Sequence, residues 1–536
     1  MFEAFRQQAA TQIAGWSLPE KVGQLFILAF PGKDAEAARP LITRYNLGGC
    51  YLSQDNADTF AEARELTRAM DGMRRADFPP LLLGVDQEGA WSVLSPDSTT
   101  GPGNLALGSA ADPQLTAAMY GVYGNEMRSA GFNCVLGPCA DINLKPNSPI
   151  IDTRSFGEIP VRVSAHVAAA VHGAHDGGIV ACAKHFPGHG DTTGDTHRDI
   201  PSVDKSLEQL LEQDLAPFQA AIQSRVELIM TSHIRYPQID PEHPATLSAP
   251  ILQGILRERL GFKGIVISDS MNMGAIRRNY DAVDATLRAF RAGIDLIMLS
   301  EEHYDHQADY LERQLAMVEA VADAVRDGRF PEDELNAKLE RVVAFKLARL
   351  EHMALYRDFD PAQSQQVERQ AAEAAIKLLT DPGHCLPLRR DDAVVLIQTT
   401  PEADYDNLVN PRGIGPNQAT PAFKYFAQAL LEQHHNVTVL DHDLARTFVA
   451  NAATQPGQVI LAVTENYPLP GEDFKQDASR ELVAALAERF GSRLVVISLR
   501  SNYLPVPEGV GHLCAYSSRP CSAEAAARAC VGTPGI

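Results

Sequence analysis

The stretch GIVISDSMNMGA, from Gly264 to Ala275, joins a short apolar run to polar residues at its carboxyl end. An apolar run of this length, rich in β-branched residues, is typical of a strand buried on both faces of a parallel sheet. Seven similar runs occur within the first 300 residues. They lie at 23–30, 47–52, 81–86, 133–138, 179–186, 228–234 and 295–300.

Helix-like stretches, such as residues 56–75 and 206–224, separate these apolar runs. Eight alternations of strand and helix predict an α/β fold of the (β/α)8 TIM-like barrel type. An open, doubly wound sheet is the alternative, because periodicity alone does not distinguish the two. Polar residues at the carboxyl ends of four runs favour the barrel, whose catalytic groups come from those ends. They are Asp86, Lys184, His185, Ser232, His233, Ser268 and Asp269.

The pattern changes after residue 300. Residues 302–356 resemble long helices, and a second alternation of strands and helices begins near residue 373. This alternation predicts a smaller α/β sandwich. We therefore expect a barrel domain over 1–356, a linker over 357–375 and a C-terminal sandwich over 376–536. The apolar runs of the sandwich lie at 393–398, 437–441, 459–463, 494–499 and 512–517.

Composition restricts the partners of the chain. A formal charge of −21 over 536 residues disfavours nucleic acid. No window approaches eighteen uninterrupted apolar residues, so we expect no membrane span. The eight cysteines form no CxxC pair, which indicates free thiols in a reducing compartment. The first sixteen residues have no apolar leader segment, and a cytoplasmic location is expected. The oligomeric state is left open.

The stretch KHFPGHGDTTGDTH, residues 184–197, concentrates titratable groups in a glycine-rich loop. Zinc ligands usually occur at tight helical or knuckle spacing, and a lysine beside a cation is unfavourable, so we expect no metal. The stretch lacks the order of a phosphate-binding loop, and its aspartates would repel phosphate. A plain surface loop is a further alternative. The possible metal ligands are His185, His189, Asp191, Asp195 and His197.

An acid–base role is the interpretation that we favour for this loop. Asp195 and His197 are two residues apart, so in an extended loop their side chains share one side. The carboxylate can then fix the imidazole tautomer and leave the other ring nitrogen for a substrate. A nucleophile should face this pair, and Asp269 is the candidate. Its alternative role is that of N-cap to a helix over 271–279.

These residues resemble a known family. The stretch at 184–197 is similar to the K-H-F-P-G-H-G-x4-D-[ST]-H signature of the β-N-acetylhexosaminidases of glycoside hydrolase family 3, in their two-domain form. Other segments follow in the order of that family. They are VDQEG at 85–89, GPGNLALG at 101–108, TRSFG at 153–157 and SDSMNMGA at 268–275, with LPL at 386–388 and AYSSRPCSAEAAARA at 515–529 in the second domain.

The resemblance implies a retaining mechanism with a covalent glycosyl-enzyme. It assigns the nucleophile to Asp269, the general acid/base to His197 and the partner of that histidine to Asp195. It implies neither a metal nor an organic cofactor. The residues that it assigns to binding of the sugar hydroxyls are Asp86, Arg154, Lys184 and His185.

One departure affects the expected substrate. The family pattern continues D-Q-E-G-G-R-V-x-R, whereas this chain has Trp91 and Leu94 in place of the two arginines. The second arginine normally contacts the substrate, so the exact sugar stays open.

The expected function is that of a retaining exo-β-N-acetylglucosaminidase acting on small glycoconjugates such as peptidoglycan fragments. The alternatives are a glycoside phosphorylase, a β-glycosidase of altered sugar specificity and a carbohydrate-binding pseudoenzyme. All matched functional positions precede residue 300, so the second domain is expected to be mainly structural.

Overall fold

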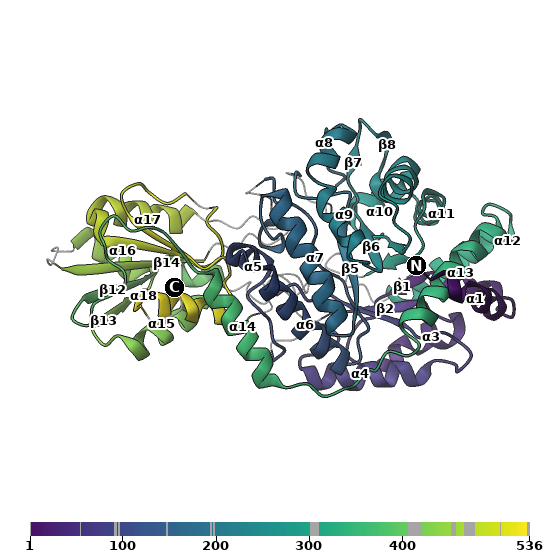
Figure 1. Ribbon diagram of the computed structural model, residues 1–536, viewed down its shortest axis with the longest axis horizontal. Coiled ribbons are helices and arrows are strands. Elements are labelled where there is room, and N and C mark those ends of the chain that lie inside the picture. The colour runs from purple at the N-terminus through teal and green to yellow at the C-terminus, as the bar shows by residue number, and fades with distance from the viewer. Residues whose placement is uncertain are drawn as a thin grey trace.

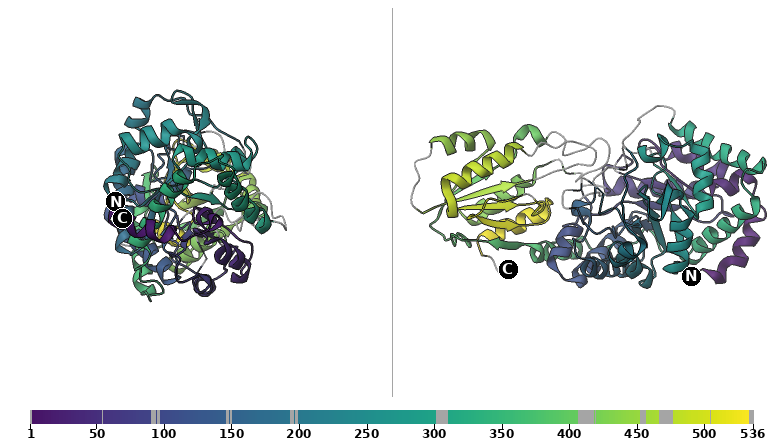
Figure 2. Two further views of the ribbon diagram at one scale, coloured as in Figure 1. Left: turned by 90° about the vertical axis from the view of Figure 1, so that its right-hand side faces the viewer. Right: turned by 90° about the horizontal axis from the view of Figure 1, so that it is seen from above.

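Two lobes make up the molecule in the computed structural model, and Figure 1 and the right view of Figure 2 show them side by side. The larger lobe contains the chain from its N-terminus to helix α13, which ends at Arg349, and the smaller lobe contains the C-terminal sheet. The structure describes residues 2–53, 55–89, 94, 97–145, 148, 150–192, 196, 199–300, 310–405, 418, 420–451, 457–465, 477–503 and 505–532.

Eight parallel strands form the larger lobe, in the order β10-β1-β2-β3-β4-β5-β6-β9. β1 pairs with β10, and a bridge between Ile267 and Leu296 joins β9 to β10, which closes the sheet into a barrel. The predicted (β/α)8 barrel is confirmed, and the open-sheet alternative is wrong. The strands are β1 (Phe26–Leu28), β2 (Gly49–Leu52), β3 (Leu82–Val85), β4 (Cys134–Val135), β5 (Val180–Phe186), β6 (Leu228–Thr231), β9 (Ile265–Ile267) and β10 (Ile297–Leu299).

The barrel strands are buried on both faces, as their continuous apolar character predicts. All seven residues of β5 are buried, including the polar Lys184 and His185. One face packs inside the barrel and the other against the surrounding helices. A lysine and a histidine inside such a strand need charged or hydrogen-bonding partners, because an unpaired buried charge is very costly.

Helices surround the barrel. The expected helix over 206–224 is two helices, and Pro217 lies in the first turn of the second, where its missing N–H costs no hydrogen bond. No helix within the described ranges is both long and apolar enough to cross a membrane. The helices are α1 (Arg6–Ile13), α2 (Leu18–Gly23), α3 (Arg39–Tyr45), α4 (Phe60–Met73), α5 (Asn104–Ala110), α6 (Pro113–Ser129), α7 (Pro160–Asp176), α8 (Leu207–Glu212), α9 (Ala216–Gln223), η5 (Pro250–Arg259), α10 (Gly274–Arg277), α11 (Ala282–Ala292), α12 (Tyr310–Arg326) and α13 (Glu332–Arg349).

A six-stranded sheet in the order β11-β16-β15-β14-β12-β13 forms the smaller lobe. All five predicted runs are strands, and the added edge strand β11 is antiparallel to β16. Two separate apolar clusters, one on each face, make this lobe an α/β sandwich. Its elements are β11 (Lys377–Thr380), β12 (Ala393–Gln398), α15 (Ala422–Gln433), β13 (Val437–Leu440), α16 (His442–Asn451), β14 (Gln458–Thr464), α17 (Asp477–Phe490), β15 (Leu494–Ser498), β16 (Gly511–Cys514) and α18 (Pro520–Cys530).

Helix α14 (Pro361–Ala375) connects the two lobes and occupies most of the expected linker (Figure 1). Asp360 caps it by accepting a hydrogen bond from the backbone N–H of Ala362. The apolar cluster of the barrel extends to Ala371, and the first cluster of the sandwich begins at Ala372. The linker is therefore a packed helix, and the domain limits at 356 and 376 stay predictions.

Candidate active site

Lys184 occupies the centre of a buried charge cluster at the carboxyl ends of the barrel strands. Its Nζ lies 2.5 Å from Oδ1 of Asp86 and 2.6 Å from Oε1 of Glu88. Asp86 and Glu88 follow β3, whereas Lys184 lies near the end of β5. Burial lowers the pKa of Lys184, but the charges of Asp86 and Glu88 outweigh burial and raise it overall. The lysine is therefore a permanent cation.

Arg154 adds a second cation to this cluster. Its Nε and Nη2 donate to the two carboxylate oxygens of Glu88, at 2.8 and 3.0 Å. Burial would raise the pKa of Glu88, but the charges of Arg154 and Lys184 hold it below its usual value. Since Glu88 is 1% exposed, it serves as the shared anion that fixes both cations.

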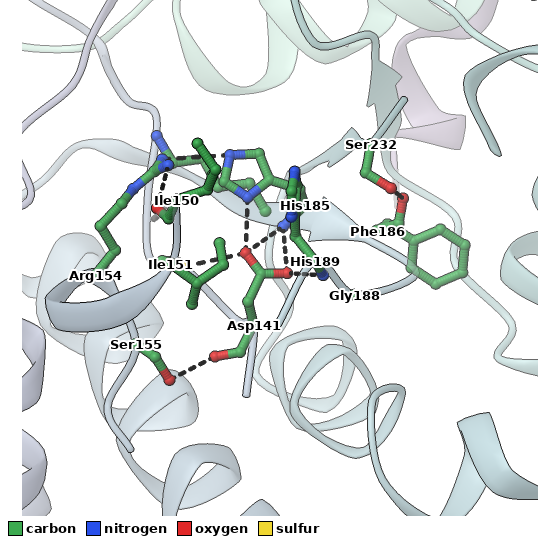
Figure 3. A network of polar contacts seen from close by, with 12 residues as sticks. Asp141, Ile150, Ile151, Arg154, Ser155, His185, Phe186, Gly188, His189 and Ser232 are labelled. Atoms are coloured by element: carbon green, nitrogen blue, oxygen red, sulfur yellow. Dashed lines mark hydrogen bonds and ion pairs between the residues drawn. The ribbon is translucent and has the colours of Figure 1, made fainter. Parts of the chain in front are cut away.

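His185, which follows Lys184 in β5, is held by a carboxylate from the segment that follows β4. Its Nδ1 lies 2.7 Å from Oδ2 of Asp141, and its backbone N–H also reaches that carboxylate (Figure 3). Burial would raise the pKa of Asp141, but the charge and hydrogen bond of His185 lower it to about 2. With its Nδ1 proton directed at Asp141, His185 presents Nε2 toward Arg154, 3.3 Å from Nη2.

The sequence analysis did not assign a role to Glu88 or Asp141. Glu88 lies within the quoted segment VDQEG, and its position two residues after Asp86 was the available signal. Asp141 follows the fourth apolar run, in the position that the other strand-end residues occupy. Each of these acids is almost fully buried and pairs with residues that the sequence analysis did assign.

His189 joins two later residues of the glycine-rich loop after β5 by hydrogen bonds. Its two ring nitrogens lie 2.9 Å from Oγ1 of Thr192 and 3.2 Å from Oγ1 of Thr196. Burial lowers the pKa of His189 to about 4, so this ring is neutral and serves as a structural hydrogen-bonding group. Asp195 and His197, the predicted acid–base pair, lie outside the described residues.

Asp269 follows β9 and is partly exposed, with Oδ1 accepting a hydrogen bond from the backbone N–H of Ser270 at 2.8 Å. Helix α10 begins at Gly274, and its N-cap, Met273, makes no side-chain capping bond, so Asp269 is not a helix cap. His233 supports this segment by donating from Nε2 to the carbonyl of Ser270 at 2.9 Å.

The charges of Asp86 and Asp269 both act on the buried thiol of Cys182. Burial raises the pKa of the Cys182 thiol to about 12, Lys184 opposes this rise, and the Asp86 and Asp269 charges add to it. Cys182 lies in β5, two residues before Lys184. Both carboxylates are therefore within electrostatic reach of the same point inside the barrel.

The segment that departs from the family pattern is described only in part. Leu94 is 1% exposed, and its backbone N–H donates to Oε1 of Gln87 at 3.0 Å. Gln87 in turn donates to the carbonyl of Thr99. Leu94 is thus a core residue in a position where an arginine was expected, and Trp91 lies outside the described residues.

Cys139, Asp141 and His185 form the one group within the described residues whose donor atoms are close enough to share a metal ion. Structural zinc takes four ligands, and a cysteine ligand must be a thiolate. Burial and the charge of Asp141 raise the pKa of Cys139 well above its usual value. The protonated thiol and the Asp141–His185 hydrogen bond therefore fit a metal poorly.

Two arginines of the second lobe contact loops of this site. Nε of Arg500 donates to Oδ2 of Asp152 at 2.8 Å, and Nε of Arg519 donates to the carbonyl of Gly89 at 2.7 Å. Asp152 opens the short helix η3 (Asp152–Arg154), and Gly89 directly follows Glu88. Both arginines are almost completely buried. The second lobe therefore holds the two loops that carry the buried Glu88–Arg154 pair.

A barrel whose strand ends carry paired acids, a lysine, an arginine and a histidine has the groups that a glycoside hydrolase requires. The chain matches the sequence profile described as "Glycosyl hydrolase family 3 N terminal domain" over residues 17–345. It therefore belongs to glycosyl hydrolase family 3, a family of sugar-cleaving enzymes.

Individual relatives agree with this assignment. Beta-hexosaminidase A of Pseudoalteromonas piscicida is 31% identical over 378 residues, which are 66% of this chain but only 63% of that protein. The "Beta-N-acetylglucosaminidase/beta-glucosidase" of Cellulomonas fimi is 26% identical over 499 residues, 86% of this chain and 83% of that protein. The structure of a family 3 beta-N-acetylglucosaminidase from Paenibacillus sp. str. FPU-7 matches with a TM-score of 0.82 at 28% identity, covering 97% of both chains.

Proposed function

We propose that the protein is a retaining exo-β-N-acetylglucosaminidase, which cleaves terminal β-linked N-acetylhexosamine through a covalent glycosyl-enzyme. The observation that carries this proposal is the cluster of Asp86, Glu88, Arg154 and Lys184 at the same end of the barrel as Asp269. The family and the names of the relatives support the same activity.

Asp269 is the proposed nucleophile. It follows a rigid, buried strand, is partly exposed and accepts one local backbone hydrogen bond, so one carboxylate oxygen is available for attack on the anomeric carbon. The hydrogen bond from His233 to Ser270 restrains the neighbouring backbone. A fixed carboxylate lowers the barrier because the reacting atoms are held near attack distance.

His197 is the proposed general acid and base, with Asp195 as the partner that orients it. The backbone between them gives this role support: the carbonyl of Thr196 accepts a hydrogen bond from the N–H of Ala275 at 3.1 Å. Thr196 is therefore joined to the segment that follows Asp269. A protonated imidazole would assist departure of the leaving group, and the neutral ring would then activate water.

The charge cluster forms the proposed binding site for the sugar hydroxyls. Asp86 can accept hydrogen bonds, Lys184 and Arg154 can donate them, and Nε2 of His185 can accept one. Glu88 and Asp141 hold those donors in position and do not need to contact the sugar. Rigid partners of this kind reduce the entropy that is lost on binding.

The proposed substrates are small glycoconjugates, such as peptidoglycan fragments, in the cytoplasm. All eight cysteines are buried and unpaired, which supports a reducing compartment. Because Trp91 and Leu94 replace the two arginines of the family pattern, the sugar specificity of this chain can differ from that of the family. The Cellulomonas fimi relative is named for both N-acetylglucosaminidase and glucosidase activity.

A panel of aryl β-glycosides, assayed with and without inorganic phosphate, tests this proposal. We expect the N-acetylglucosaminide to be cleaved fastest and free N-acetylglucosamine to be the product in both buffers. Formation of a sugar 1-phosphate in the phosphate buffer would indicate a phosphorylase. Faster cleavage of the glucoside would indicate altered specificity, and failure to cleave any glycoside would indicate a sugar-binding protein.

Chelation is expected to leave the activity intact. The buried thiol of Cys139 is protonated, and the Asp141–His185 pair is satisfied internally, so the proposed chemistry does not require an ion there. Exhaustive dialysis against EDTA should change kcat by less than about twofold, since no step depends on a metal ligand. Loss of activity that added zinc restores would contradict this expectation.

Replacement of Arg500 by alanine is expected to lower kcat/KM by about tenfold, mostly through a higher KM, because η3 and Arg154 would lose their anchor. The change removes the ion-pair partner of the buried Asp152, and removing one partner of a buried pair is destabilising. Steady-state kinetics with an aryl N-acetylglucosaminide provides the measurement.

Two further variants separate positioning from loss of folding. Arg500→Lys should recover part of the KM effect, because a lysine can still reach a carboxylate. Arg390→Ala, at an exposed position of the second lobe, should leave both kinetic constants unchanged. An Arg500→Ala protein that is folded and has an unchanged KM would show that the second lobe is only structural.

A further inference from the structure

A cavity of about 480 Å³ opens at the amino-terminal ends of the barrel strands, opposite the candidate active site. Phe262 and Lys263 line it just before β9 begins, and Asp295, which contacts its lining, lies just before β10. Although the chain carries a net charge of −21, the cavity is rich in cations. They are Arg6, Arg257, Lys263, Arg291, Lys338 and Arg341.

Three of these cations surround one buried carboxylate at the back of the cavity. Nη2 of Arg257 lies 2.7 Å from Oδ2 of Asp295, and Nη1 of Arg341 lies 2.6 Å from Oδ1. Lys338 belongs to the same group and donates from Nζ to the carbonyl of Ile294 at 2.8 Å. Asp295 is fully buried and supplies a single negative charge, so this group keeps an excess of positive charge.

The positive charge of Lys338 has no carboxylate paired with it within the described part of the protein. Its side chain is 9% exposed and forms no ion pair with a described carboxylate, and its one hydrogen bond uses one of three N–H donors. Burial lowers the pKa of Lys338 to about 8; the charges of Asp295 and Glu334 oppose this, and the charges of Arg341 and Arg257 add to it. A bound anion would stabilise the ammonium form.

The mouth of the cavity adds further positive charge. Lys263 and Arg291 are exposed there, and Arg6 lies beside them. The two acids in the lining, Glu3 and Glu334, are also exposed, so water and salt screen them more strongly than they screen the buried cations. Nε of Arg6 lies 3.1 Å from Oε2 of Glu3, so Lys263 and Arg291 supply the positive charge at the mouth.

We propose that this cavity binds a phosphorylated small molecule, with its phosphate groups among Arg257, Lys338 and Arg341. A phosphate group offers three oxygens and up to two charges, which suits several convergent donors better than a single carboxylate does. The volume is within the range of small-molecule sites, and the rings of Phe2, Phe262 and Phe290 provide apolar walls for the rest of the ligand.

Binding here has a direct structural link to the barrel. Asp295 accepts a hydrogen bond from the backbone N–H of Val266 at 2.9 Å and holds the start of β9. The far end of the same strand leads to Asp269. A ligand that changes how Arg257 and Arg341 pair with Asp295 therefore acts on the strand that carries the proposed nucleophile, without contacting the substrate.

Calorimetric titration of the full chain with inorganic pyrophosphate, at low ionic strength, tests the proposal. We expect saturable binding at one site, and at least a tenfold loss of affinity in Lys263→Glu and in the double variant Lys263→Glu/Arg6→Glu. These positions are at the mouth of the cavity, so the fold should persist. Arg390→Glu makes the same change of charge at an exposed position of the other lobe and should bind like the wild type.

Saturating N-acetylglucosamine separates this cavity from the active site. Pyrophosphate should still bind at one site when the sugar is bound and in Asp269→Ala, because the two ligands occupy different sites. Turnover without pyrophosphate should be the same in Lys263→Glu as in the wild type. Absence of saturable binding, competition with the sugar, or equal weakening by Arg390→Glu would overturn the proposal. None of these results bears on glycoside cleavage, which the aryl glycoside panel measures separately.

Discussion

Replacement of Asp269 by alanine is expected to lower kcat by roughly three or more orders of magnitude, as removal of a covalent nucleophile does. The neighbouring structure should persist, because Asp269 is partly exposed and accepts its hydrogen bond from the next residue, Ser270. Cleavage of an activated aryl N-acetylglucosaminide gives the most sensitive measurement. Added azide should restore part of the rate by replacing the missing carboxylate as nucleophile.

A nearby acid provides the matched control for this variant. Asp284 is exposed in the first turn of α11, fifteen residues further along the chain, so Asp284→Ala removes the same group from outside the site. It should retain wild-type turnover. If Asp269→Ala kept more than about a tenth of the wild-type rate, the nucleophile would have to be another residue.

Replacement of His197 by alanine is expected to affect substrates according to their leaving groups. Poor leaving groups need a proton and should lose about 10²- to 10⁴-fold in rate, whereas good leaving groups should lose little in the bond-breaking step. Asp195→Ala should show the same trend less strongly, because the carboxylate only orients and stabilises the ring. A series of aryl glycosides of graded phenol pKa measures the slope.

The outcome of this series separates acid catalysis from a general loss of structure. A steeper dependence on leaving-group pKa in His197→Ala supports its role as the acid. Equal losses across the whole series would rule that role out. His189→Ala is a useful comparison, because the His189 ring is buried and hydrogen-bonded within the loop. If that ring supports only the structure, its removal should reduce the rates for all substrates alike.

The barrel could be predicted from the sequence because each of its strands is a continuous apolar run. Strands of a parallel sheet that is covered on both faces are apolar along their whole length, and all eight predicted runs are strands in the structure. The antiparallel hairpin of β7 (Arg235–Tyr236) and β8 (Asp240–Pro244) was not predicted. Its charged and proline-containing segments lack the apolar alternation by which strands are recognised.

Part of the candidate site could also be predicted from the sequence. The strand-end positions of Asp86, Lys184 and His185 could be recognised from the sequence, whereas their proposed binding roles came from the family resemblance. Glu88 and Asp141 were missed because their roles depend on side-chain contacts across strands that only the closed barrel fixes. The contacts of Arg500 and Arg519 depend on how two lobes pack, and neither composition nor periodicity carries that information.

Trapping of the glycosyl-enzyme tests the central claim most directly. A 2-fluoro or 5-fluoro glycoside with a good leaving group should slow both steps and let the covalent intermediate accumulate. Digestion and mass spectrometry would then locate the sugar on one peptide. We predict an adduct on Asp269, within the peptide that contains SDSMNMGA. An adduct on any other residue, or inactivation without an adduct, would contradict the proposed mechanism.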